Sequence, residues 1–227
     1  MALGIQGKCR YTHVPAILEV AGIPYTGSSP LGHTLAMDKV VAKQILIASG
    51  LPTPNYQVFS DPKQSFVHLQ FPLIVKPRGE AASFGLRIVH DTESLKEAVN
   101  QILLDFKQPA LIEEYIEGRE INVGILGNNT PQAFPALELI LKDQVLNIHD
   151  YARVDFRLDR YNQPHILEVN SMASLNPSSS FVYAAKKAGY SFNGLINRIV
   201  EVACERYADE EPAYFNLQAK SRERGGS

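Results

Sequence analysis

The stretch Ala152–Ser171, ARVDFRLDRYNQPHILEVNS, predicts two β-strands joined by a polar turn. Residues two apart in a strand share a face, so Val154 and Phe156 belong to an apolar layer that Leu167 and Val169 continue in the second strand. The side chains that this alternation places on the opposite face carry charges or an amide: Arg153, Asp155, Glu168 and Asn170.

Two interpretations of this polar face remain open from the residues alone. One is the solvated outer face of an antiparallel sheet, where charged and apolar residues alternate as a rule. The other is a site for a hard cation, because the carboxylate and amide oxygens of Asp155, Glu168 and Asn170 suit Mg²⁺ held between the protein and substrate phosphates. Arg153 would then stabilise charge on a transferring phosphoryl group.

A second candidate lies upstream, where Lys76 ends the apolar run FPLIVKP at residues 71–77. A loop with Gly79 and Gly85 follows, and a lysine beside such a loop suits nucleotide phosphates, which the ammonium group neutralises and backbone N–H groups cradle. The alternative is a surface lysine in front of a turn. The chain has no Walker A pattern, so a P-loop nucleotide site is excluded.

The segment IEEYIEGRE, residues 112–120, is the third candidate. If it joins two lobes, the backbone of Tyr115 and Ile116 could meet an adenine, while Glu113 and Glu120 could bind the adenine amino group and the ribose. Taken alone it is equally an acidic turn.

The surrounding pattern mixes helices with hairpins, which favours an α+β fold over a doubly wound parallel sheet. Helical spacing predicts helices at residues 12–21, 31–50 (one helix ended by Gly50), 91–106, 176–189 (with Asn176 as its cap) and 192–207. Further strands are expected at residues 71–77, 86–90, 110–116, 120–127 and 133–141. Pro52 and Pro54 indicate a linker between the second helix and the strands.

Composition is that of a globular protein, with 45% hydrophobic and 20% charged residues among 227. The formal net charge of -2 argues against a nucleic-acid partner. The first residues lack the uninterrupted apolar core of a signal peptide or membrane span. Cys9 and Cys204 are expected to be free thiols, so we expect a cytoplasmic protein without membrane contact.

Four segments in this order resemble the D-alanine–D-alanine ligases and their relatives in the ATP-grasp superfamily. They are HVPAILEVAGIPYTGSSPLGHTLAMDK, PLIVKP, LIEEYIEGREINVGILG and the pair ARVDF and ILEVN. The resemblance covers most of residues 3–207, and it implies an ATP-grasp fold in which two α+β lobes grip ATP. Implied boundaries are a remnant of an N-terminal substrate domain at 1–37, a central lobe at 38–115, a C-terminal lobe at 116–210 and a disordered tail at 211–227.

The resemblance also implies a role for each matching residue, with ATP and Mg²⁺ as cofactors. Lys39 and Lys76 would contact the phosphates, and Arg153 would steady the acyl phosphate and the tetrahedral species after it. Ser83 would lie in the loop that closes over the phosphates. The remaining roles are adenine contact by Glu113, Tyr115 and Ile116, ribose contact by Glu120, and Mg²⁺ ligation by Asp155, Glu168 and Asn170.

The chain departs from the family pattern at several places. Ala81 and Ala82 replace a glycine and a serine of the phosphate loop. Ala173 and Ser174 stand where the family has the Pro-Gly that helps to seat the second amino acid, although Ser178 to Ser180 still offer hydroxyls nearby. Most of the N-terminal domain is missing, and QVLNIHD runs straight into YARVDF, where the family has a long lid insertion.

We therefore expect a carboxylate–amine ligase that acts on small-molecule carboxylate and amine substrates through an acyl phosphate, with a homodimer as one assembly to test. The chief alternative is a reduced ATP-grasp scaffold that binds nucleotide without ligase activity. A ligase for other carboxylates, for example a peptide-forming enzyme, is a third possibility.

Overall fold

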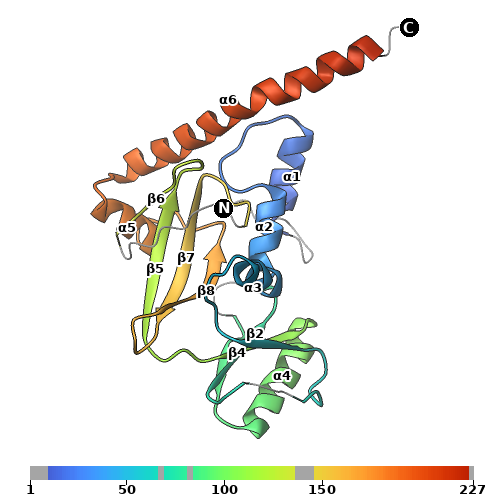
Figure 1. The fold of residues 1–227 in the computed structure, drawn as a ribbon, viewed down its shortest axis with the longest axis vertical. Coiled ribbons are helices and arrows are strands. Elements are labelled where there is room, and N and C mark those ends of the chain that lie inside the picture. Colours follow the sequence, from blue (N-terminus) through green and yellow to red (C-terminus); the bar gives the residue numbers. More distant parts are fainter. Residues whose placement is uncertain (1–9, 66–68, 81–83, 136–145, 225–227) are drawn as a thin grey trace.

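The computed structural model describes residues 10–65, 69–80, 84–135 and 146–224, and it describes side chains up to residue 209. Within these ranges two four-stranded sheets are joined by a single crossing of the chain (Figure 1). The helices are α1 His13–Val20, α2 Pro30–Met37, α3 Lys39–Ala48, α4 Thr92–Phe106, α5 Ser180–Lys187 and α6 Phe192–Arg224. The strands are β1 Tyr56–Phe59, β2 Leu73–Pro77, β3 Arg87–Val89, β4 Ala110–Glu114, β5 Arg119–Leu126, β6 Gln132–Ala133, β7 Tyr151–Leu158 and β8 Pro164–Asn170. The mixed helical and antiparallel architecture is the predicted α+β class.

The first sheet has the order β1-β4-β2-β3 and is antiparallel throughout. Helix α4 packs on it, and Leu73, Val75, Leu95 and Val99 form a core with no more than 1% of each residue exposed. Asp91 begins α4 with a capping box, because its carboxylate accepts from the Ser94 backbone N–H at 2.8 Å. This compact layer pair is the platform that carries Lys76 and Glu113.

The second sheet has the order β6-β5-β7-β8 and is covered on both faces. Helices α5 and α6 pack on one face, and α3 packs on the other, as Figure 1 shows. Gly124 of β5 allows the close approach of α5, since a Cβ there would lie 2.7 Å from the Phe134 ring and 2.9 Å from the Phe181 ring. The part of this sheet that α5 does not cover carries polar side chains of β7 and β8 and faces the first sheet.

The single helix predicted for residues 31–50 is wrong, because the structure breaks it at Asp38 into α2 and α3. Asp38 has an extended backbone with ψ 97°, and its Oδ1 accepts from the backbone N–H groups of Val40 and Val41. Arg78 of the other lobe holds the same carboxylate with two bonds of 2.8 and 2.7 Å. A long-range ion pair therefore makes Asp38 an N-cap rather than a helix-interior residue.

The predicted hairpin forms, and its register places Arg153 opposite Asn170 and Asp155 opposite Glu168. A bulge between Asp155 and Phe156 then shifts the pairing, so that Phe156 lies opposite Ile166. The assignment of Leu167 to the apolar layer is wrong for this reason: Ile166 and Val169 enter the core, whereas Leu167 lines the same cavity as Glu168.

Other elements differ from prediction in smaller ways. Strand β1 forms directly after the linker, where no strand was expected, and pairs with β4. Ser179, rather than Asn176, is the N-cap of α5. A disordered tail was expected from residue 211, whereas α6 continues to Arg224 through a sequence rich in helix-forming residues. Most of the strand predicted at 133–141 lies outside the described residues, and no described helix is long and apolar enough to cross a membrane.

Candidate functional site

A cavity of about 280 Å³ lies between the two sheets. Its walls come from β2, β3 and β4 of the first lobe and from β5, β7 and β8 of the second. Eight of the predicted site residues line it: Lys39, Lys76, Glu113, Tyr115, Ile116, Glu120, Asp155 and Glu168. Arg153 and Asn170 are not among the lining residues, but each forms hydrogen bonds with Asp155. Ser83 lies outside the described residues.

Lys39 enters the cavity from the first turn of α3, so the break at Asp38 determines its direction. Its ammonium donates to the carbonyl of Glu80 and lies 4.0 Å from the Glu168 carboxylate of the other lobe. Burial lowers the pKa of Lys39, and the negative charge of Glu168 partly opposes that effect. Lys39 thus places a positive charge against the polar edge of the second sheet.

Glu113 is buried, with 1% exposed, between two ammonium groups. Lys43 Nζ lies 2.8 Å from one carboxylate oxygen and Lys76 Nζ lies 2.5 Å from the other. Burial by itself would raise the pKa of Glu113, but the charges of Lys76 and then Lys43 hold that pKa below its usual value. Glu113 is therefore a buried anion whose oxygens are both taken by lysines.

The apolar side chains of the cavity are Ile74 and Ile88 of the first sheet, Leu86 next to β3 and Leu167 of the second sheet, together with Phe84, Pro77 and Ile116. Arg157 organises the segment that joins the lobes: its guanidinium lies 4.7 Å from the centre of the Tyr115 ring and donates to the Ile116 carbonyl at 3.1 Å. Its other nitrogen lies 3.5 Å from the carboxylate of Glu120, whose side chain is largely exposed. The joining segment is held in place by the second lobe.

Asp155 lies at the polar end of the cavity. Arg153 binds both of its carboxylate oxygens at 2.7 Å, and Asn170 donates to Oδ2 at 2.9 Å. Those bonds raise the pKa of Arg153, so the guanidinium stays charged. The four predicted residues of the hairpin face therefore form one connected cluster, with Glu168 beside Lys39.

The donor set fits a hard cation in kind and in position. Two carboxylates and one amide come from directly paired strands, and such oxygen ligands suit Mg²⁺ when phosphates supply the remaining positions. No group of three or more His, Cys, Asp or Glu side chains that could hold a metal by itself occurs in the part of the chain that the structure describes. Any Mg²⁺ here would need nucleotide oxygens.

Two residues of the site were missed by sequence reasoning, namely Lys43 and Arg157. Lys43 is one turn beyond Lys39 on α3 and is buried, with 2% exposed. The signal was present, because residues four apart share a helix face and Lys43 lies among the apolar residues of that face. Arg157 was on the polar side of the predicted strand, but its partners in the joining segment were not evident.

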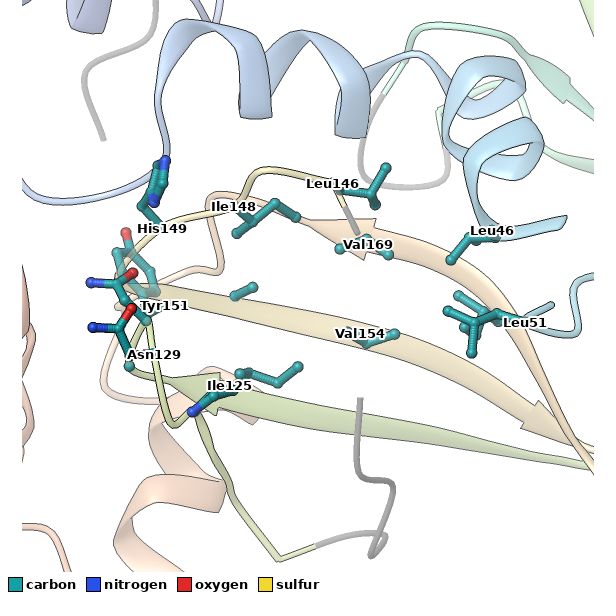
Figure 2. Close-up of a pocket in the computed structure, with 15 residues that line it drawn as sticks. Leu46, Leu51, Ile125, Asn129, Leu146, Ile148, His149, Tyr151, Val154 and Val169 are labelled. Carbon is teal, nitrogen blue, oxygen red and sulfur yellow. The ribbon is translucent and has the colours of Figure 1, made fainter. Parts of the chain in front are cut away.

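A second cavity of about 320 Å³ lies on the opposite face of the second sheet (Figure 2). This apolar groove is lined by Leu46 and Leu51 next to α3, by Ile125, Val154 and Val169 of the sheet, and by Leu146 and Ile148 of the segment before β7. Asn129 and His149 lie at its polar end. None of the predicted site residues lines this groove.

Comparison with known proteins gives a consistent set of similarities. A sequence profile described as "D-ala D-ala ligase C-terminus" matches residues 45–151 and 144–201. An uncharacterized protein, y4sG, of Sinorhizobium fredii is 43% identical and aligns with 91% of this chain and 74% of its own length. A D-alanine–D-alanine ligase of Carboxydothermus hydrogenoformans is 32% identical over 85% of this chain and 77% of its own length.

Among solved structures, the D-alanine–D-alanine ligase of Bacillus anthracis complexed with ATP has a TM-score of 0.72 and 26% identity. It covers 88% of this chain, which in turn covers 76% of that protein. The chain thus spans about three quarters of these relatives. The alignment with the Sinorhizobium protein runs over 249 positions but covers 91% of 227 residues, so that relative has internal residues that this chain lacks. The two profile matches meet at residues 144–151, beside the apolar groove.

Proposed function

Because this chain belongs to the D-alanine–D-alanine ligase family and has its ATP-grasp fold, we propose that it is an ATP- and Mg²⁺-dependent ligase that joins a carboxylate to an amine through an acyl phosphate. The observation that carries the proposal is that lysine ammonium groups and carboxylate groups line the same cavity. Lys39 reaches it from the start of α3 and Lys76 from β2, and Asp155 and Glu168 reach it from β7 and β8 of the second sheet.

The lining of the cavity suggests one orientation for ATP. The apolar end between Ile74 and Leu167 would receive the adenine, next to the backbone of Tyr115 and Ile116. Glu120, at the outer edge, would meet the ribose, and the phosphates would extend toward Lys39 and Lys76. In this orientation Glu113 lies below the adenine pocket and contributes through Lys76, since both of its oxygens are occupied by lysines.

Asp155, Glu168 and Asn170 would hold Mg²⁺ against the phosphate oxygens. When bound, Mg²⁺ would withdraw negative charge from the phosphoryl group. Asp155 must then release Arg153, which at present takes both carboxylate oxygens. The freed guanidinium lies two residues along the same strand, so it reaches the position where phosphoryl charge develops.

The chemistry proposed is two successive displacements. A substrate carboxylate oxygen attacks the γ-phosphorus, the bond to the β–γ bridging oxygen breaks, and ADP leaves. The amine of the second substrate then attacks the acyl carbon, phosphate leaves with the bonding electrons, and the amine loses a proton. Lys76 and Arg153 act in both steps by placing positive charge beside oxygens that become more negative.

The acceptor side of the site differs from the family pattern. Ala173 is buried in the core with α5, and Ser174 accepts at its carbonyl from the Ser179 hydroxyl at 2.6 Å. Ser178 donates to Asn176 at 2.8 Å. These hydroxyls form hydrogen bonds within the turn before α5. The first amine to test is D-alanine, and other amino acids follow.

The test compares ATP binding, metal dependence and phosphate release in the wild-type chain. Isothermal titration with ATP should show binding that Mg²⁺ strengthens, and D-alanine should stimulate phosphate release. Glu168→Gln should weaken Mg²⁺-dependent ATP affinity by about tenfold or more, as loss of a charged ligand commonly does. ATP binding without phosphate release for any amino-acid pair would instead identify a nucleotide-binding scaffold.

Glu114→Gln is the matched control. Glu114 lines the same cavity but bonds to Asn55 at 2.9 Å and is not in the metal cluster. Its substitution should leave the Mg²⁺ dependence unchanged. Equal losses in the two variants would remove the case for a metal at Glu168.

A further inference from the structure

Lys43 occupies a site built for a charged ammonium group. Its ammonium donates to the Thr53 hydroxyl at 2.6 Å and to the Pro54 carbonyl at 3.2 Å, and it forms an ion pair with Glu113 Oε1 at 2.8 Å. The Tyr56 ring lies 5.5 Å from Nζ. A neutral amine would leave the buried Glu113 carboxylate with Lys76 as its one cation partner in the described part of the chain. Lys43 does not line the ATP cavity, so its charge interacts with buried groups of the protein and not directly with nucleotide.

Glu113 connects Lys43 to the cavity. The carboxylate is held at one oxygen by Lys43 and at the other by Lys76, whose ammonium reaches the cavity wall. A buried carboxylate with a single cation partner would pull that cation inward, because an unbalanced charge is costly in the interior. With Lys43 in place, the negative charge of Glu113 is shared between two lysines.

The same network reaches the second lobe. The Thr53 hydroxyl accepts from Lys43 and donates to the Ile166 carbonyl of β8 at 2.7 Å. Ile166 in turn donates its backbone N–H to the Pro52 carbonyl at 2.8 Å. One chain of bonds therefore runs from β8, which carries Glu168, through Thr53, Lys43 and Glu113 to Lys76.

We propose that Lys43 is a positioning residue for ATP, which acts through Glu113 to direct the Lys76 ammonium toward the phosphates and to tie that lysine to the strand that carries Glu168. This inference rests on the proposed ATP site and adds a residue that does not touch the nucleotide. Lys43 balances the Glu113 charge, and Glu113 then leaves the Lys76 ammonium available at the cavity wall.

The test uses Lys43→Met, which keeps the length of the side chain and removes its charge. ATP affinity should fall by about tenfold, the scale on which outer-shell partners commonly act. Adenosine affinity should change by less than about twofold, as expected for an uncoupled position. Adenosine lacks phosphates, so it reports on the base and ribose walls alone. Equal losses for ATP and adenosine would mean that Lys43 only maintains the structure.

A double variant keeps the test decisive if Lys43→Met folds poorly. Lys43→Met with Glu113→Gln removes the buried cation and the buried anion together, so thermal stability should recover relative to the single variant. ATP affinity should recover with it, because no unbalanced carboxylate then draws the Lys76 ammonium inward. Low ATP affinity in a stable double variant that still binds adenosine would overturn the positioning role.

The wild-type chain separates the two proposals. If it binds neither ATP nor adenosine, the proposed function fails. If it binds ATP and Lys43→Met binds ATP with unchanged affinity, only the positioning role fails.

Discussion

At the scale of single residues, the contact between Arg153 and Asp155 occupies a carboxylate of the proposed cation site. Both side chains project from β7 on the cavity side, two residues apart, and their two bonds of 2.7 Å occupy the carboxylate. Nucleotide phosphates offer Arg153 an alternative anion. Cation binding is therefore expected to follow or accompany ATP rather than precede it.

Arg153→Met should raise the affinity of Mn²⁺, used as a spectroscopic substitute for Mg²⁺, when nucleotide is absent. The expected gain is about tenfold, because a hydrogen bond to a charged group contributes about 1.5–3 kcal/mol. Electron paramagnetic resonance of free Mn²⁺ measures the affinity directly. Arg157→Met is the control, since it removes the same charge from the cavity but contacts Tyr115 and Ile116 instead. An equal gain in both variants would show a general charge effect.

Residue-level prediction from the sequence succeeded where strand alternation alone decides the outcome. The pairing of Asp155 with Glu168 follows from the period of two and the turn between the strands. It missed Lys43 and its contact with Glu113, which joins α3 to β4 across 70 residues of sequence. Long-range packing creates that pair, and no local pattern encodes it.

At the scale of elements, the turn between β4 and β5 determines how the lobes join. Gly118 has φ 156°, and a Cβ there would lie 1.8 Å from the Leu158 carbonyl oxygen at the end of β7. A side chain at this position would push the joining segment away from the second sheet. The glycine is needed both for its backbone angle and for the close approach.

Gly118→Ala should lower the free energy of unfolding by about 1–3 kcal/mol, as strained or overpacked positions do. It should also weaken ATP binding, because Tyr115 and Ile116 precede this turn. Gly189→Ala is the matched control: its φ is 96°, but a Cβ there meets nothing within 4 Å. Urea denaturation of the two variants separates the angular cost from the clash. A loss at Gly118 no larger than that at Gly189 would contradict the proposed contact.

Helix and strand boundaries were predictable where residues close in the sequence determine them. They were not predictable where a residue far along the chain determines them. The sequence predicts a helix from residue 91 with Asp91 or Thr92 as its cap, and the structure shows Asp91 as the N-cap of α4. The break at Asp38 was not, because residues 31–50 have continuous helical spacing and the partner Arg78 lies 40 residues away. The bulge that turns Leu167 into the cavity is likewise a property of the paired sheet.

At the scale of the whole molecule, the apolar groove adjoins the junction between the two matched parts of the family profile. Leu146 and Ile148 line it, and the two profile matches meet at residues 144–151. The ATP-grasp fold and the absence of an internal segment were predictable from the order of motifs. The groove was not, because it forms between the end of α3, the paired strands and the segment before β7, which no local pattern brings together.

Grafting the extra residues of the Sinorhizobium relative at this point should cover the groove. Each well-buried apolar side chain should add about 1.5–3 kcal/mol, so the melting temperature should rise and binding of an apolar fluorescent dye should fall. A graft of the same composition with its apolar residues scrambled is the control. Unchanged dye binding with the native graft would show that those residues lie elsewhere.

Strand β7 pairs with β5 on one side and β8 on the other, and all of this pairing is complete with the short connection that the chain has. The sheet therefore closes with the connection that this chain has ahead of β7. A segment added there would lie outside this pairing, so the face that carries Asp155 and Glu168 would keep its strand register.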